Sequence, residues 1–337
     1  MKNERLQVSV AMCTYNGSRY LEEQLTSIFE QTLPPDEIVL LDDCSSDDTV
    51  ALAEKLLSKS GIEYRILVNE KNSGVKHSFQ KCILACSKDI IFTADQDDIW
   101  KPEKIDHMLA EFRRDEDCVF VFSNGELTDG NARSLDADVW TTLNLRRAGL
   151  CDHVSQDRFR RILMYTWAVP GTMMAFRKSL AESCFPIPEK KGWIHDSWLA
   201  ICAPAYGHVV SLDETLTLYR QHEKNTVGVK VKRRSKRQED ITQVQKVLFY
   251  LKRHAERLSI VTESMNEKLP AAYRRQLESY ISMYRKMQHY EDDGAVKKMF
   301  FLMGCFVNGR LSAFDISRRN VLTYLFSLPR HAQPPRS

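Results

Sequence analysis

The chain has 337 residues, of which 43% are hydrophobic and 28% are charged, and its formal net charge is +3. This is the composition of an ordinary soluble globular protein, and the length allows two domains with a sizeable core. The first seven residues are polar, and the apolar run that follows, from Val8 to Cys13, is too short for a signal peptide. We therefore expect a cytoplasmic protein rather than a secreted one.

Short apolar runs alternate along the chain with segments whose apolar residues recur at helical spacing. Four such repeats predict an α/β fold with a mostly parallel central sheet and helices on both faces. The segment from Asp129 to Val154 is polar and aperiodic, and it predicts a long excursion over the active-site face. The predicted strands are Val8 to Cys13, Ile38 to Leu41, Tyr64 to Val68, Ile90 to Phe92, Val119 to Phe122, Thr172 to Phe176 and Thr215 to Tyr219; the predicted helices are Tyr20 to Gln31, Asp47 to Ser58, Val75 to Cys86 and Pro102 to Phe112.

Two groups of residues within the helical segments are interpreted as core. One is the stripe formed by Tyr20, Leu21, Leu25, Ile28 and Phe29. The other is the pair Cys82 and Cys86, which are one helical turn apart but have no second pair to complete a metal site. The chain has nine cysteines and no CxxC pair, which indicates free thiols in a reducing compartment.

Charge is distributed unevenly along the chain. Residues 1–227 contain 26 Lys and Arg against 35 Asp and Glu, whereas residues 228–337 contain 22 against 10. Amphipathic helical patterns begin near Asp240, so we predict an α/β domain over residues 1–228 and a basic, helical region over residues 229–337. The longest apolar stretch there, Met299 to Val307, is far shorter than the roughly 20 residues that span a bilayer.

The basic region contains six cations within eight residues, from Lys230 to Arg237. Such a run favours an anionic membrane surface or a nucleic acid, and a solvated linker is the simpler alternative. No RRM, zinc-finger or helix-turn-helix signature accompanies it, so we expect no nucleic-acid partner. The region is expected to attach the protein to the inner face of the cell membrane. The alternative is a helical cap that packs on the catalytic domain or, in a homodimer, on a second subunit.

An acidic cluster follows the fourth predicted strand. Asp95, Asp97 and Asp98 occupy three of four positions, and Lys101-Pro102 after them is expected to open a helix. The carboxyl ends of strands are where open α/β sheets bind ligands, and a few hard oxygen ligands suit Mg²⁺ or Mn²⁺ shared with phosphates. The cluster therefore predicts a metal-bound nucleotide diphosphate, with a solvated helix-capping turn as the alternative. Asp98 is expected to be the capping carboxylate.

Polar residues also follow the first two predicted strands, at the same sheet edge. Asp43 can accept a hydrogen bond from a pyrimidine N3–H, while the backbone and small polar groups of Thr14, Tyr15 and Asn16 can line the base and ribose. No GxGxxG motif follows the first strand, which disfavours a Rossmann cofactor site.

Two later segments complete the predicted chemistry. Asp196, after His195 and among tryptophans, is a candidate general base for an acceptor hydroxyl; desolvation would raise its pKa, and His195 or a metal would lower it. The alternative is a carboxylate at a helix N-terminus. Arg220 suits a diphosphate, and His222 suits a metal or the same phosphates.

The ordered set of motifs resembles the family 2 glycosyltransferases with the GT-A fold over roughly residues 6–228. The resemblance implies a GT-A type, Rossmann-like domain. In it, Asp43 contacts the donor base and Asp95 lies near the ribose. Asp97 binds the metal, and His222 completes the metal or phosphate contacts. The resemblance also implies that Asp196 is the base of an inverting transfer. The motifs are Thr14-Tyr15-Asn16-Gly17, Asp42-Asp43, Ser45-Ser46-Asp47, Asn72-Ser73-Gly74, Asp95-Gln96-Asp97-Asp98-Ile99-Trp100, Gly171-Thr172, His195-Asp196 and Tyr219-Arg220-Gln221-His222.

The DQDDIW and YRQH forms are most similar to the bacterial rhamnosyltransferase-like branch. This similarity implies a dTDP-rhamnose or UDP-sugar donor and a saccharide acceptor on a growing, lipid-linked polysaccharide such as O-antigen. Ser78 departs from the family pattern, in which Asn is frequent. The alternatives are a sugar-phosphate nucleotidyltransferase, disfavoured by the single glycine between Thr14 and Arg19, and a non-catalytic scaffold that works through the basic tail.

Overall fold

The structure is a computed structural model, and it describes residues 5–143, 145–148, 150–153, 169–190, 192–223 and 255–289. The chain divides into two compact units. One comprises Met1–Arg146 with Leu150–Val231, and the other comprises Arg147–Gly149 with Lys232–Ser337. Most of the second unit lies outside the described residues, so the predicted boundary after residue 228 stays a prediction.

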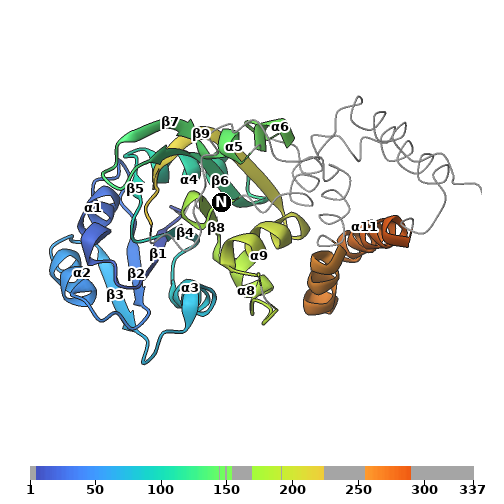
Figure 1. Cartoon of the computed structure of the whole chain (residues 1–337), viewed down its shortest axis with the longest axis horizontal. Coiled ribbons are helices and arrows are strands. Elements are labelled where there is room, and N and C mark those ends of the chain that lie inside the picture. Colours follow the sequence, from blue (N-terminus) through green and yellow to red (C-terminus); the bar gives the residue numbers. More distant parts are fainter. Residues whose placement is uncertain are drawn as a thin grey trace, which may run out of the picture. The chain divides into compact units, whose positions relative to one another are not determined.

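Strands and helices alternate through the first 114 residues, as the apolar pattern predicts (Figure 1). The predicted ranges differ from the observed ones by only a few residues at each end. Pro102 lies in the turn before its helix rather than in the first helical turn. The elements are β1 (Val8–Thr14), α1 (Ser18–Phe29), β2 (Glu37–Asp42), α2 (Thr49–Leu57), β3 (Glu63–Val68), α3 (Gly74–Ala85), β4 (Ile90–Ala94), β5 (Ile99–Trp100) and α4 (Lys104–Arg114).

The second half of this unit completes the sheet with long strands and short helices. β9 begins seven residues before the predicted strand at Thr215, and Thr172 belongs to a 3₁₀ turn that precedes β8. The elements are β6 (Cys118–Thr128), β7 (Ser134–Asp138), α5 (Val139–Thr142), α6 (Leu145–Ala148), η1 (Gly171–Met173), β8 (Met174–Arg177), α8 (Lys178–Cys184), α9 (His195–Cys202), η2 (Ala203–Ala205) and β9 (His208–Arg220).

The strands form one sheet in the order β3-β2-β1-β4-β8-β6-β9-β5, with β7 paired to β6. The pairs β3–β2, β2–β1, β1–β4 and β6–β9 are parallel, whereas β8 is antiparallel to both of its neighbours. This arrangement confirms the predicted mostly parallel sheet. It also brings the carboxyl ends of β1, β2, β4 and β9 to one edge.

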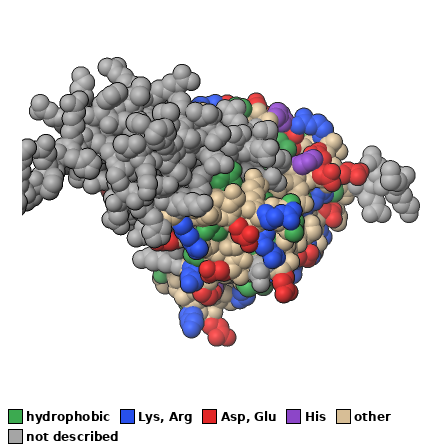
Figure 2. All heavy atoms as spheres, turned by 90° about the vertical axis from the view of Figure 1, so that its right-hand side faces the viewer, with side chains coloured by type: hydrophobic (Ala, Val, Ile, Leu, Met, Phe, Trp, Pro, Cys, Tyr) green, Lys and Arg blue, Asp and Glu red, His purple; other side chains and the backbone are tan. Residues whose placement is uncertain are grey.

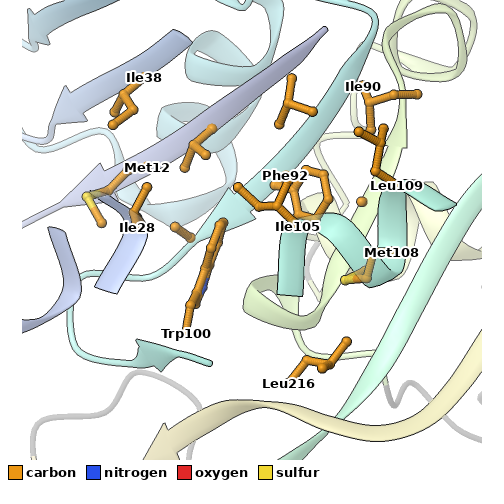
Figure 3. Close-up of a cluster of buried hydrophobic side chains, with 14 of the residues drawn as sticks. Met12, Ile28, Ile38, Ile90, Phe92, Trp100, Ile105, Met108, Leu109 and Leu216 are labelled. Carbon is orange, nitrogen blue, oxygen red and sulfur yellow. The ribbon is translucent and has the colours of Figure 1, made fainter. Parts of the chain in front are cut away.

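A hydrophobic core lies between the sheet and helices α1, α2 and α4 (Figure 3). Alternate residues of the strands face this cluster, because side chains alternate across a sheet; Met12, Ile38, Phe92 and Trp100 are examples. The other face of the sheet carries α3, whose Cys82 thiol lies 3.2 Å from the Val39 carbonyl oxygen. Cys82 and Cys86 are both buried, as expected.

The segment after β6 differs from the expected irregular excursion. It contains β7 and the short helix α5, whose Trp140 is fully buried. The Asp138 carboxylate accepts a hydrogen bond from the Thr141 amide at 2.9 Å and caps this helix. A helix of four residues is too short to produce a helical hydrophobic period, which is why the sequence pattern misses it.

The described part of the second unit is helical. Residues 255–265 form a helix, η3 (Asn266–Lys268) is a 3₁₀ turn and α11 spans Ala271–His289. Leu277 and Ile281, one helical turn apart in α11, are buried, as expected of an amphipathic helix. No helix within the described residues combines the length and hydropathy needed to cross a lipid bilayer.

The basic run from Lys230 to Arg237 and the apolar stretch from Met299 to Val307 lie outside the described residues. On the face shown in Figure 2, acidic and basic side chains are interspersed over the described part of the surface. The predicted roles of the basic run, at a membrane surface or in a dimer, therefore stay predictions.

Candidate active site

The acidic cluster lies on the loop between β4 and β5, at the edge where the four strand ends meet. Asp95 and Asp97 are partly buried, and Asp98 has no exposed surface. Burial, together with the negative charges of Asp97 and Asp196, raises the pKa of Asp95 to about 7. Four carboxylates drawn from two distant segments therefore share one site that favours positive charge.

Tyr219, near the end of β9, is buried beside the same group. Burial raises the pKa of its phenol, and the carboxylates of Asp98, Asp95, Asp97 and Asp196 raise it as well. Tyr219 thus lies within electrostatic range of all four carboxylates. The start of α9, which carries Asp196, and the end of β9 therefore both lie near the loop after β4.

Asp97 and His222 meet directly. The His222 Nε2 atom lies 2.7 Å from Asp97 Oδ2, although 125 residues separate the two in sequence. The imidazole also stacks on Tyr20 of α1, with ring centroids 4.9 Å apart. A carboxylate oxygen and an imidazole nitrogen on mostly buried side chains form a donor pair that suits a divalent cation.

Tyr20 thus belongs to the site, and its interpretation as a core residue is wrong. It is only partly buried, whereas Leu21, Leu25 and Ile28 of the same predicted stripe are fully buried. Helical spacing places Tyr20 at the margin of the buried face, where an aromatic residue can pack on the sheet or on a site with equal ease.

Asp43 is held as an ionised acceptor after β2. Its carboxylate receives hydrogen bonds from the amides of Ser73 and Gly74, both at 2.8 Å, and from the Asn69 side chain at 2.9 Å. Burial opposes ionisation, but these hydrogen bonds outweigh it and lower the pKa of Asp43 below its usual value. Ser78, the departure from the family pattern, is buried and lies 3.3 Å from Asn69 in this network.

The residues after β1 are fixed by the loop after β2. Thr14 donates from its hydroxyl to Asp42 at 2.7 Å, and the Asn16 side chain accepts from the Ser46 amide at 2.9 Å. Asn16 has a left-handed backbone conformation with φ of 49°, which asparagine adopts more readily than most residues. Tyr15 between them is 48% exposed, so its ring is available to a ligand.

Gln96 joins the loops after β1 and β4. Its side-chain oxygen accepts from the Tyr15 amide at 2.8 Å, and its side-chain nitrogen donates to the Tyr15 carbonyl at 3.1 Å. The side chain lies directly on Gly17, where a Cβ atom would come within 2.1 Å of the Gln96 oxygen. Gly17 therefore permits this close approach of Gln96, and its backbone angle is not unusual.

Arg220 is 2% exposed, and its guanidinium binds protein groups. Nε donates to the Asp97 carbonyl at 2.7 Å, Nη1 donates to the Gly130 carbonyl at 3.0 Å, and Nη2 pairs with Glu23. These bonds hold the acidic loop, the turn after β6 and α1 together. The predicted contact of Arg220 with a diphosphate stays a prediction.

Asp98 also helps to hold the acidic loop in place. Its carboxylate accepts from the Arg220 amide at 3.0 Å, so it links the acidic loop to the end of β9. The prediction that Asp98 caps the following helix is wrong, because the N-cap residue of α4 is Glu103.

His195 and Asp196 begin α9, as predicted. His195 is buried, its ring stacks on Phe79 at 3.8 Å, and burial lowers its pKa to about 3. The predicted influence of His195 on Asp196 stays a prediction. The ring also lies on Gly171, where a Cβ atom would come within 2.5 Å of Nε2.

A second group of potential metal ligands lies elsewhere in the described residues. Asp115, Asp117 and His208 place one ligand atom each within 4.8 Å of one another. They lie at the amino-terminal ends of β6 and β9, at the opposite edge of the sheet from Asp97. The group is mostly exposed, and His208 pairs with Asp115 at 2.7 Å, as surface ion pairs commonly do.

Comparison with known proteins identifies the family. The sequence profile described as Glycosyl transferase family 2 matches residues 9–185, more than half of the chain. The chain belongs to glycosyl transferase family 2. This membership sets aside the nucleotidyltransferase alternative for this glycosyltransferase.

Several bacterial proteins are similar in sequence to this glycosyltransferase. The dTDP-rhamnosyl transferase RfbG of Shigella flexneri is 31% identical over 241 residues, which cover 67% of this chain and 76% of RfbG. An uncharacterized glycosyltransferase of Nostoc is 28% identical over 65% of this chain and 66% of its own length. The putative teichuronic acid biosynthesis glycosyltransferase TuaG of Bacillus subtilis is 29% identical, with 40% and 53% covered. The matched part of the chain thus spans about two thirds of the length of the Nostoc protein and about half of the length of TuaG.

Solved structures support the fold of this glycosyltransferase. S. aureus TarS 1-349 in complex with UDP-GlcNAc has a TM-score of 0.56 at 15% identity, with 97% of this chain and 93% of that chain covered. The mannosyltransferase PcManGT from Pyrobaculum calidifontis, in complex with GDP-Man and Mn²⁺, has a TM-score of 0.50 at 14% identity, with 96% and 86% covered. At such identities the likeness concerns the fold, and it confirms the predicted GT-A type, Rossmann-like domain.

Proposed function

We propose that this glycosyltransferase moves a sugar, with inversion, from a dTDP- or UDP-linked donor to a hydroxyl of a growing bacterial surface polysaccharide such as O-antigen, carried on a lipid. The observation that carries the proposal is the contact of 2.7 Å between Asp97 and His222, with Asp95 and Asp196 beside it. RfbG, the relative with 31% identity, is described as a dTDP-rhamnosyl transferase.

In this proposal the donor lies along the sheet edge. Asp43 accepts from the N3–H of the base, Thr14, Tyr15 and Asn16 line the base and ribose, and Asp95 lies near the ribose. Asp43 suits its role because its network keeps the carboxylate ionised. A pyrimidine N3–H then meets an acceptor rather than a protonated acid.

Asp97 and His222 would hold Mg²⁺ or Mn²⁺, which would neutralise charge on the leaving diphosphate. The donor pair fits such an ion because its two ligand atoms already converge. Arg220 donates a hydrogen bond to the backbone carbonyl of Asp97, while the carboxylate of Asp97 contacts His222.

Asp196 would act as the general base. As the acceptor oxygen bonds to the anomeric carbon on the face opposite the diphosphate, its proton passes to the Asp196 carboxylate, and the bond between the sugar and the phosphate oxygen breaks. Asp95 lies within electrostatic range of Asp196, so the proposed base adjoins the proposed cation site.

A panel of nucleotide sugars tests the proposal. Purified enzyme with Mn²⁺ is expected to release nucleoside diphosphate from dTDP-rhamnose or a UDP-sugar faster than from GDP- and CDP-sugars, and excess EDTA is expected to stop the release. A parallel assay with a nucleoside triphosphate and a sugar 1-phosphate should release no pyrophosphate. Lack of turnover with every donor would favour the non-catalytic scaffold.

We also propose that the basic tail attaches the enzyme to the inner face of the membrane, where a lipid-linked acceptor would present its sugar. Each cation near an anionic surface contributes roughly 1 kcal/mol, so the six between Lys230 and Arg237 would give salt-sensitive binding. The enzyme is expected to sediment with anionic vesicles at low salt and to be released at high salt. Replacement of the six cations by Gln should weaken binding; indifference of the wild type to vesicles would favour dimerisation instead.

A further inference from the structure

A lysine with no exposed surface lies beneath the site. Lys104 is the first residue of α4, and its ammonium donates to the Thr172 carbonyl at 2.5 Å and to the Thr217 hydroxyl at 2.9 Å. The same nitrogen lies 3.9 Å from the centroid of the Trp100 ring. An ammonium has three N–H donors, so two acceptors and one aromatic face account for its bonding capacity.

Two of these partners lie in strands that adjoin Asp97 and His222, and the third lies in a turn that packs against the residue before Asp196. Trp100 is in β5, directly after the acidic loop; Thr217 is in β9, five residues before His222. Thr172 is in η1, next to Gly171, on which the His195 ring packs immediately before Asp196. One buried nitrogen therefore connects the backbone around Asp97, His222 and Asp196.

Simple space filling does not explain a lysine here. Lysine is almost never fully buried unless it is paired, and a methionine of similar length would fill the volume without the desolvation cost of a cation. Burial lowers the pKa of Lys104 well below its usual value, although the negative charges of Asp98 and Asp95 oppose this shift. The residue thus lies within electrostatic range of the acidic loop that its contacts brace.

We propose that Lys104 is a positioning residue for the divalent-cation site: its ammonium ties β5, β9 and η1 together and sets the separation of Asp97 from His222. The inference rests on the proposed function, because it assumes that these two side chains hold the cation. Lys104 touches neither of them and acts through Trp100, Thr217 and Thr172.

The test compares Lys104→Met with wild type in two measurements. The first is Mn²⁺ binding by electron paramagnetic resonance, with UDP present and no sugar transfer. The second is donor turnover as a function of Mn²⁺ concentration. Loss of a group that orients metal ligands from outside typically costs about 10- to 100-fold in metal affinity or activity. We expect weaker Mn²⁺ binding in that range and a lower kcat, with little change in the donor KM at saturating Mn²⁺.

Two control variants separate positioning from general stability. Met108→Ala removes a buried side chain one turn further along α4, in the core cluster that also contains Trp100, so it loosens the same helix but keeps Lys104 and its three partners. Lys101→Met removes a nearby lysine whose nitrogen lies 3.0 Å from the Thr215 hydroxyl on β9. Both variants, assayed well below their melting temperatures, are expected to bind Mn²⁺ like the wild type.

A milder variant carries the test if Lys104→Met fails to fold. Thr217→Val removes one acceptor of the ammonium and leaves the lysine in place, and it should weaken Mn²⁺ binding in the same direction by a smaller factor. Wild-type Mn²⁺ affinity in Thr217→Val, or in a folded Lys104→Met, would overturn the inference. Failure of the wild type itself to bind Mn²⁺ with UDP would instead count against the proposed function.

Discussion

Replacement of Asp97 by alanine is expected to abolish sugar transfer, with a loss of about 10³-fold or more. The proposed cation site would lose its carboxylate, and a metal that stabilises a leaving group typically contributes several kcal/mol to the transition state. The fold should survive, because Arg220 binds the backbone carbonyl of Asp97, which alanine retains. His222 keeps its stacking contact with Tyr20.

The measurement is nucleoside diphosphate release at saturating donor and Mn²⁺, with circular dichroism to check folding. Asp106→Ala is the matched control, since it removes an exposed carboxylate of α4 whose weak pair with Arg113 spans 3.7 Å. This variant should behave like the wild type. Appreciable turnover by folded Asp97→Ala, or by the wild type in excess EDTA, would show that the cation site is elsewhere or unnecessary.

Asp196→Asn is expected to lower kcat by about 10²-fold or more while donor binding is retained, as for loss of a general base. Asparagine has nearly the same shape, and its side-chain oxygen can still accept from the Ser197 amide, which Asp196 does in this structure. The adjacent His195 cannot replace the base, because its ring is buried against Phe79 and Gly171.

Single-turnover transfer measures the rate of the chemical step, and protection against heat by the donor measures donor binding. Glu182→Gln is a suitable control, because Glu182 is an exposed acid of the neighbouring helix α8, 3.5 Å from Lys178. A folded Asp196→Asn variant with near-normal kcat would remove Asp196 from the mechanism. A variant that loses donor binding as well would assign Asp196 to the donor pocket.

The site could be predicted from sequence wherever polar residues follow a strongly apolar strand. Asp43 and Asp97 were expected at one sheet edge on this basis, and the parallel pairing of β1 with β2 and β4 brings their loops to that edge. The local pattern suffices here, because the carboxyl ends of parallel strands converge whatever the rest of the chain does.

The supporting residues could not be predicted in this way. Glu23 and Arg220 pair across 197 positions, and Lys104 reaches Thr172 across 68. No periodicity records such contacts, since they depend on how β9 and η1 return to the loop after β4. A lysine in the first turn of an amphipathic helix reads as solvent-exposed, and only the packing of β5 against β9 covers it.

The link between Gln96 and Tyr15 has a consequence for sequence change in this enzyme. The primary amide of Gln96 offers one donor and one acceptor to the backbone of Tyr15, as a neighbouring peptide would, so it adds an extra rung to the ladder between β1 and β4. That rung crosses Gly17 at a spacing that excludes a Cβ atom. A side chain at position 17 would therefore displace the flexible end of Gln96, and the two hydrogen bonds that join the loops after β1 and β4 would be lost.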